Sequence, residues 1–166
     1  MSDSPSFEIT DVTRFTTGTV GPKGQRTFYL QVEGPGELVS LKLEKQQVQA
    51  LAEYLDTMMT DLPSARPEEL PVDLELADPV IAEWIVASMG VAYSEAEAAI
   101  ILWAEELVRD EDDESVTPAT GRFQVSLAQA EAFVHRARKI IGDGRPPCDF
   151  CGTPLNDDSG WCPCHN

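Results

Sequence analysis

Arg26-Thr-Phe-Tyr-Leu-Gln-Val32 is rich in β-branched and aromatic residues, which are typical of a strand, and Gly34-Pro-Gly36 follows it as a turn. Glu37-Leu-Val-Ser-Leu-Lys-Leu43 alternates apolar and polar residues and predicts the next strand. From Glu44 the period changes to that of a helix, with apolar residues three and four positions apart at Val48, Leu51, Ala52, Leu55, Met58 and Met59. The sequence therefore predicts a β-meander that leads into a helix.

The same order of elements recurs along the chain. Two strands are predicted upstream at 7–9 and 14–20, and a long hairpin is predicted downstream at 82–93 and 98–108, followed by a strand at 121–126. Ser126 and Gln129 form the capping-box signature of a helix from Leu127 to about Ile141. Both halves of the chain are thus predicted to run through strands into a helix.

The two halves also align in sequence. At an offset of 82 residues (125 − 43), four positions match: Leu43 with Val125, Gln47 with Gln129, Ala50 with Ala132 and Leu51 with Phe133. The identities are few, so internal duplication and chance similarity both remain open. The predicted fold class is α+β: a domain at 1–145 made of two β-meander-plus-helix halves, about 1–62 and 80–145, with helices covering the faces of the sheet. A groove between the halves is the natural place for a binding site.

A proline-rich connector at 63–79 is predicted between the halves. Its prolines are separated by acidic residues, which favours an extended chain. Val72, Leu74 and Leu76 alternate with polar residues, which indicates that part of the connector packs on the domain.

The segment at 146–166 is predicted to bind zinc. It holds all four cysteines and one of the two histidines of the chain. Cys148 and Cys151 are two residues apart on one predicted turn, and a second turn supplies Cys162 with either Cys164 or His165 as the fourth ligand. Two such turns facing each other suit a structural, tetrahedral Zn²⁺. The spacing leaves Cys164 and His165 as alternatives, and it predicts a zinc knuckle at the C-terminal end.

Other chemistry for the cysteines fits the sequence less well than zinc does. Disulfides are disfavoured because no charged-then-apolar leader precedes Phe7, so a reducing cytoplasm is expected. Cys148-Asp-Phe-Cys151 has the spacing of a redox dithiol, but no helix is predicted after it to lower the pKa of a thiol. Catalytic zinc would need an open position and a general base, and no glutamate in the tail is placed for that role.

Charge restricts the classes of partner. The formal net charge of −17 opposes binding to phosphate backbones and anionic lipid, so a nucleic-acid partner is not expected. No apolar run reaches membrane-spanning length. The acidity has two explanations, a functional surface or a host with high internal salt.

A basic cluster precedes the tail and is a candidate partner surface: His135, Arg136, Arg138, Lys139 and Arg145. Cations near the C-terminal end of a helix complement its dipole, which is the structural explanation. The functional explanation is a docking surface for an acidic partner or a phosphate. Both remain open, and the structural one is favoured.

Signs of an enzyme are weak. No glycine-rich loop has the spacing of a phosphate cradle, and His135 is predicted to be a solvated histidine. An enzyme that used the groove between the halves would bring together charged side chains such as Arg14, Arg26 or Arg122. Trp84, Tyr93 and Trp103 could line such a groove, but core packing is the favoured prediction.

Three stretches of the chain resemble the actinobacterial family known as domain of unknown function 3090: Phe15–Gln31, Leu43–Leu51 and Gly144–Gly152. The resemblance covers nearly the whole chain. It implies a cytoplasmic protein and supplies no activity. The family has a histidine two residues before the third cysteine, where this chain has Gly160, so the fourth zinc ligand is not transferred from the family.

A zinc-binding protein that acts as a protein-interaction or regulatory module is the function predicted from the sequence. The alternatives are an enzyme or small-ligand-binding protein that uses the groove between the halves, and a thiol-redox protein.

Overall fold

The structure is a computed structural model that describes residues 4–22, 24–62, 74–108 and 117–142. It contains a seven-stranded sheet and two helices, so the predicted α+β class is confirmed. The elements follow the chain as β1 (Phe7–Ile9), β2 (Arg14–Val20), β3 (Thr27–Gly34), β4 (Glu37–Leu43), α1 (Lys45–Thr60), β5 (Ala82–Ser94), β6 (Ala99–Glu106), β7 (Thr120–Val125) and α2 (Leu127–Gly142).

The sheet is two antiparallel meanders joined side by side. Its strand order is β1-β7-β6-β5-β4-β3-β2, and each meander of three consecutive strands leads into a helix. Between the meanders, β4 and β5 run parallel, and β1 pairs in parallel with β7. The predicted order of strands, turns and helices is therefore confirmed.

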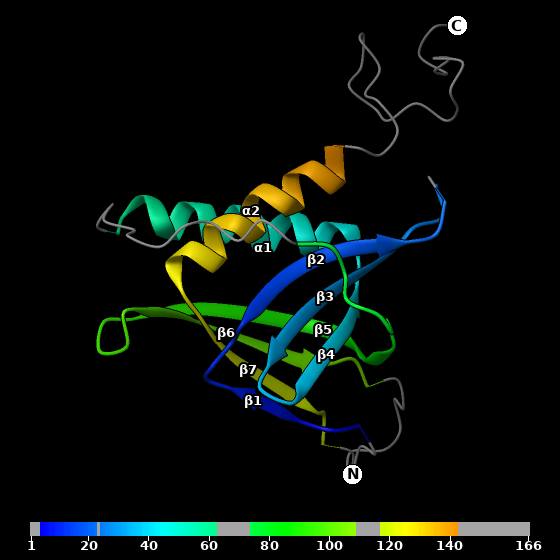
Figure 1. Ribbon diagram of the computed structural model, residues 1–166, viewed down its shortest axis with the longest axis horizontal. Helices are drawn as coiled ribbons and strands as arrows, with labels where there is room; N and C mark the ends of the chain where they lie inside the picture. The colour runs from blue at the N-terminus through cyan, green and yellow to red at the C-terminus, as the bar shows by residue number, and fades with distance from the viewer. Residues whose placement is uncertain (1–3, 23, 63–73, 109–116, 143–166) are drawn as a thin grey trace, which may run out of the picture.

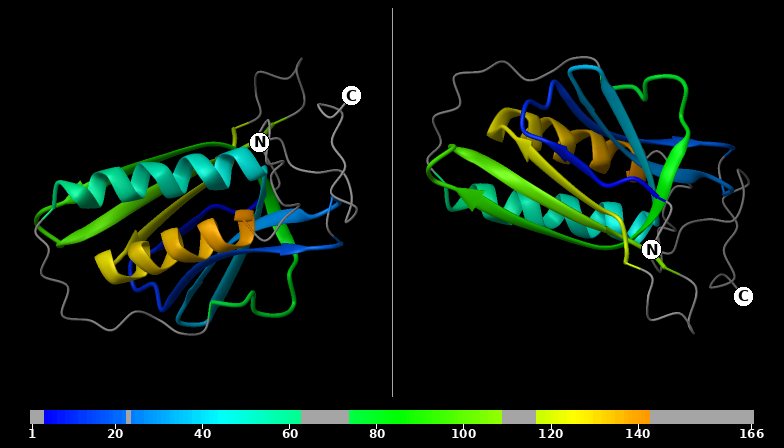
Figure 2. Two further views of the ribbon diagram at one scale, coloured as in Figure 1. Left: turned by 90° about the horizontal axis from the view of Figure 1, so that it is seen from above. Right: turned by 90° about the horizontal axis from the view of Figure 1, so that it is seen from below.

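Both helices lie on one face of the sheet, as Figure 1 shows, and they lie side by side when seen from above in Figure 2. The edge strands β1 and β2 are neighbours in sequence, so the sheet must curl to bring its two edges together. β1 comes close to the end of β3 at Gly34, because a Cβ there would stand 2.6 Å from Cγ2 of Ile9. A larger residue at position 34 would push the edge strand β1 away.

The core fills the space between the helices and the curled sheet. Its largest fully buried aromatic side chains come from both halves: Phe15, Phe123 and Phe133. The rings of Phe15 and Phe133 are stacked, with centroids 4.5 Å apart and an interplanar angle of 13°. This contact joins α2 of the second half to β2 of the first half, so the halves share one core.

The two helices begin in the same way. The side-chain oxygen of Gln129 accepts a hydrogen bond from the backbone N–H of Ser126 at 2.9 Å, and the Ser126 hydroxyl accepts one from the Gln129 backbone at 3.0 Å. The predicted capping box is thus confirmed. In α1, the side-chain oxygen of Gln47 likewise accepts a hydrogen bond from the backbone N–H of Glu44, at 2.7 Å. Such caps stabilise a helix by about 1 kcal/mol each.

The correspondence between the halves extends from sequence to strand register. Glu8 of β1 pairs with Arg122 of β7, and Ala82 of β5 pairs with Ser40 of β4. Ala82 thus corresponds to Glu8 at an offset of 74 residues (82 − 8), and Arg122 corresponds to Ser40 at an offset of 82 (122 − 40). The side-chain amide of Gln129 donates to the carbonyl of Val12 at 2.7 Å, and that of Gln47 donates to the carbonyl of Val86 at 3.2 Å. These positions show the same two offsets. Each helix is therefore tied at its first turn to the other half.

The connector crosses the sheet on the face opposite the helices. The Gln31 amide pairs with the backbone of Ala77 twice, donating to its carbonyl at 2.9 Å and accepting from its N–H at 2.7 Å. Thr16 donates to the carbonyl of Leu74 at 2.6 Å, and Leu76 lies so close to Gly18 that a Cβ there would be 2.5 Å from its Cγ. The prediction that the connector packs is confirmed for residues 74–77.

In the part of the chain that the structure describes, neither helix is long and apolar enough to cross a membrane.

Candidate functional site

A groove runs between α1 of the first half and β5 of the second half. It has a volume of about 460 Å³ and is lined mostly by apolar atoms from Gln47, Ala50, Leu51, Tyr54, Ala87, Ser88, Met89, Gly90 and Val91. This volume lies within the range of small-ligand sites. The sequence predicted a groove between the halves as the natural binding site, and this groove lies at such a place.

Gln47 closes one end of the groove. Its side-chain amide donates to the carbonyl of Val86 at 3.2 Å and to that of Ala87 at 3.4 Å, which holds the first turn of α1 against β5. Beyond this contact the groove is open, and Tyr54 on its wall is 59% exposed. An exposed aromatic residue beside an apolar groove is typical of a surface that receives a partner.

The equivalent place in the other half is filled. Phe133 and Phe15 stand at the positions that correspond to Leu51 and Met89, at offsets of 82 and 74 residues, and their stacked rings occupy the space between α2 and β2. Two aromatic rings are replaced by a leucine and a methionine on the groove side. The groove therefore exists because the side chains at these two positions do not fill it.

A hydrogen bond closes the same place from the helix side. Nε of Arg136 donates to the carbonyl of Thr17 at 3.2 Å, and the guanidinium lies 3.7 Å from the carboxylate of Glu75. Tyr54 and Val91 stand at the corresponding positions of the groove. Within the described residues, Gln47 makes the side-chain hydrogen bonds that join α1 to β5, and Tyr54 adds none. The groove therefore stays open beyond Gln47.

The candidate partner surface on α2 is divided by the fold. His135, Arg138 and Lys139 are exposed, whereas Arg136 is half-buried and directed at β2. Arg138 forms an ion pair with Asp56 of α1, with an N–O distance of 2.9 Å. A small polar cleft of about 250 Å³ lies here between the helices and includes His135 and Arg138 in its wall. The prediction of a solvated His135 is confirmed, and two of the arginines contribute to packing and pairing inside the domain.

The remaining member of that surface, Arg145, lies outside the described residues, as do all the predicted zinc ligands: Cys148, Cys151, Cys162, Cys164 and His165. Within the described ranges, no group of three or more histidine, cysteine, aspartate or glutamate side chains could hold a metal ion. The zinc site and its fourth ligand therefore stay a prediction.

The arginines that an enzyme in the groove would bring together do not meet. Arg14 donates to the side chain of Gln31 at 3.2 Å, on the face that the connector covers. Arg26 donates to the carbonyl of Ile140 at the end of α2, at 2.9 Å, and lies over the ring of Phe28. Arg122 stands on β7, and none of the three arginines lines the groove. The groove has an uncharged lining instead.

The aromatic side chains favoured as core residues behave differently from one another. Trp84 is buried, and its indole N–H donates to the carbonyl of Pro5 at 2.8 Å. Tyr93 is half-buried, but Trp103 is 42% exposed on β6, so core packing was the wrong prediction for Trp103. Its position corresponds to Gln31 in the other half, at an offset of 72 residues (103 − 31), on the face of the sheet away from the helices.

The residues of the groove itself were not singled out from the sequence. Leu51 matches an ordinary core position of a helix, and Met89-Gly90 matches the middle of a strand. The alignment of the halves held the only signal, since it places Phe133 opposite Leu51. A smaller side chain at an aligned core position indicates where one half is less closely packed than the other.

Neither a curated protein nor a solved structure matches the chain. One family model matches residues 7–162, which is most of the chain and includes both halves of the domain. Its description is "Protein of unknown function (DUF3090)". The resemblance seen in the sequence is thereby confirmed, and the chain belongs to the DUF3090 family.

Proposed function

We propose that the protein is a binding module that recognises the apolar part of a protein partner through the groove between α1 and β5. The observation that carries this proposal is the contrast between the two halves. The place that Phe15 and Phe133 fill on one side is an open, apolar groove on the other, with Tyr54 exposed on its rim. Apolar concavities of this kind contribute most of the free energy of recognition when a partner fills them.

The lining favours binding over catalysis. Its polar side chains are Gln47, Ser88 and Tyr54, and the amide of Gln47 already bonds to the backbone of β5. General acid–base catalysis needs a titrating group within hydrogen-bond reach of the substrate. The lining residues include no carboxylate, histidine, cysteine or lysine.

The capacity of the groove is tested by filling it. We expect a neutral aromatic probe, 2-naphthalenemethanol, to shift the methyl NMR signal of Met89 in the full chain. Ala50 is exposed and lines the groove, so Ala50→Trp is expected to weaken binding at least about tenfold by occupying the space. Gln49→Trp adds the same side chain to an exposed neighbouring position outside the lining and is the matched control.

Two results would argue against the groove as a recognition site. One is that the Met89 signal does not respond to the probe. The other is that Ala50→Trp and Gln49→Trp bind it equally well. The buried Met59 is an internal reference, because its signal is expected to stay in place.

Zinc in the C-terminal tail is the second part of the proposal. Cys148, Cys151 and Cys162 would bind Zn²⁺ together with Cys164 or His165, and the metal would fix the geometry of a segment rich in glycine and proline. The support is the clustering of all four cysteines in one short segment. The zinc knuckle would then be displayed beside the last helix, as part of a regulatory or interaction surface.

Elemental analysis tests the zinc site. Protein purified without chelator or oxygen is expected to carry one zinc per chain, and Cys162→Ser should lose it because Cys162 belongs to both alternative ligand sets. Only one of Cys164→Ser and His165→Ala should lose it, and the variant that does so identifies the fourth ligand. Little metal, or iron in its place, would favour the thiol-redox or metalloenzyme alternatives.

Internal duplication is the third part of the proposal. The equivalent pairings and helix caps of the two halves support descent from one β-meander-plus-helix unit. On this view the groove arose when one copy of a closed arrangement lost its aromatic pair. The single shared core explains why the two copies now form one domain.

A further inference from the structure

The strand that forms one wall of the groove has an open edge. β4 pairs with β5 only as far as Ile85, because β4 ends at Leu43 and the chain then turns into α1. From Ser88 to Ser94, β5 pairs with β6 on its other side. On the groove side, the described residues therefore place no strand beside β5 after Ile85. The groove lining includes five consecutive residues of this strand, from Ala87 to Val91, so the groove follows the backbone edge.

The corresponding edge of β2 shows which backbone groups face the groove. The Thr17 carbonyl turns toward α2, where Arg136 donates to it. Val91 stands at the corresponding position of β5, and alternate residues of a strand turn their N–H and C=O to the same side. Met89, Val91 and Tyr93 are thereby expected to direct their backbone groups into the groove. An edge of this kind is a template for pairing with another extended chain.

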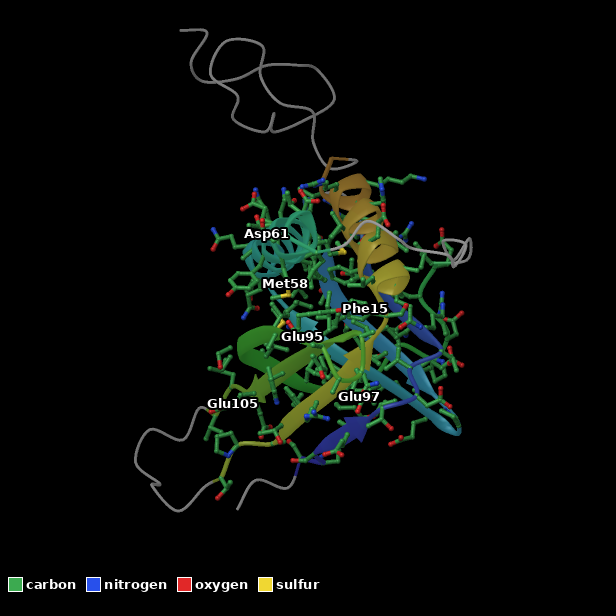
Figure 3. The ribbon with its side chains drawn as sticks, turned by 90° about the vertical axis from the view of Figure 1, so that its left-hand side faces the viewer. Phe15, Met58, Asp61, Glu95, Glu97 and Glu105 are labelled. Atoms are coloured by element: carbon green, nitrogen blue, oxygen red, sulfur yellow. The ribbon has the colours of Figure 1, made fainter. Side chains whose placement is uncertain are left out.

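Acidic residues lie near both ends of the groove. The hairpin of β5 and β6, from Ala82 to Glu106, contains five glutamates and no lysine, arginine or histidine. Glu95 and Glu97 are exposed in its turn, and Figure 3 shows that turn below the end of α1 that carries Met58 and Asp61. At the other end, the exposed Glu105 pairs in register with Ser88. The one basic residue of α1, Lys45, lies at its start. A positively charged partner complements this surface.

We propose that the groove binds an extended, basic peptide segment of a partner protein, which adds as a strand along the edge of β5 from Ser88 to Tyr93. Backbone hydrogen bonds to Met89 and Val91 hold the segment in register, and its alternate apolar side chains enter the space between Leu51, Tyr54 and Met89. Its basic side chains face the glutamates of the hairpin. This inference rests on the proposed binding function of the groove and names the kind of partner.

A random dodecapeptide library displayed on phage tests the inference against the full-length protein, with counter-selection on Ala50→Trp. Enriched sequences are expected to alternate apolar residues with lysine or arginine. As synthetic peptides they should bind Ala50→Trp at least about tenfold more weakly than Gln49→Trp or the unchanged chain, and more weakly as salt increases. N-methylation of one of the two alternating sets of peptide amides should abolish binding, since that set carries the donors that pair with a strand edge, whereas the other set faces away. Bound peptide should slow amide exchange at Met89 and Val91.

Several results would overturn strand addition. The library could yield no sequence that distinguishes the unchanged chain from Ala50→Trp, or binding could be insensitive to N-methylation. Slow amide exchange at Met89 and Val91 in the free protein would show that the edge of β5 is already occupied. The occupant would be a second copy if the protein is a dimer, and another part of this chain if it is a monomer. Binding of 2-naphthalenemethanol separates the two proposals: if the probe binds and the peptides do not, the groove remains a binding site and only strand addition fails.

Discussion

Replacing Phe133 with alanine is expected to lower the free energy of unfolding by about 3–5 kcal/mol. The side chain is 0% exposed and stacks on Phe15, so its removal leaves a cavity at the centre of the shared core. This contact also holds α2 of one half against β2 of the other, which means that the cavity would loosen the packing between the halves. Urea unfolding followed by circular dichroism measures the change, with an unchanged slope as the sign that unfolding remains two-state.

Two further variants, Phe15→Ala and Met89→Ala, provide the matched comparison. Phe15→Ala should cost nearly as much as Phe133→Ala, because it removes the other ring of the same pair. Met89 occupies the corresponding place in the second half but is half-buried beside the groove, so Met89→Ala should cost less than about 2 kcal/mol. Equal losses for Phe15→Ala and Met89→Ala would mean that the space between α1 and β5 is as closely packed as that between α2 and β2.

The sequence was sufficient for the elements of the fold because each one carries a local signal. Alternating residues mark β4, the three-and-four spacing from Val48 marks α1, and Ser126 with Gln129 marks the start of α2. The order of the strands in the sheet has no such local signal. It depends on β4 meeting β5 and on β1 meeting β7, and the paired residues are 42 (82 − 40) and 114 (122 − 8) positions apart in the chain.

The groove could not be predicted for a different physical reason. Hydrophobic periodicity says which face of a helix is buried, but not how closely that face approaches its neighbour. Leu51 and Phe133 both match the pattern of a core residue, and the distance between helix and strand is set by their volumes and by those of Met89 and Phe15. Only the comparison of the two halves turns that difference in volume into a candidate site.

The exposure of Trp103 on the outer face of the sheet could not be predicted for a related reason. Gln31 is a polar residue that is 1% exposed, and Trp103 is an aromatic residue that is 42% exposed, which reverses the usual expectation for these residue types. The cause is the connector, whose residues 74–77 lie over the first half. Its contacts join Gln31 to Ala77 across 46 positions of the chain, and no pattern within β3 reveals them.

Gln31→Ala is expected to lower the free energy of unfolding by about 1–3 kcal/mol, because it leaves buried polar groups without their partners. In the unchanged protein, the side-chain amide of Gln31 forms hydrogen bonds with the N–H and the carbonyl of Ala77 and with the hydroxyl of Ser40. We also expect the amide proton of Ala77 to exchange faster with solvent, since its acceptor is the Gln31 side chain. Hydrogen exchange followed by NMR measures this local effect, and urea unfolding measures the global one.

Trp103→Gln is the control, because it places the same amide at the corresponding position of the other half, where the native side chain is partly exposed. Its cost should stay below about 1 kcal/mol, as for other substitutions near the surface. If Gln31→Ala left the exchange of Ala77 unchanged, the connector would be held chiefly by the bond from Thr16 to Leu74 and by the contact of Leu76 with Gly18. Faster exchange at Ala77 together with a loss of stability would instead identify Gln31 as the residue that fixes the connector to the sheet. Gln31 would then explain why the outer faces of the two halves differ.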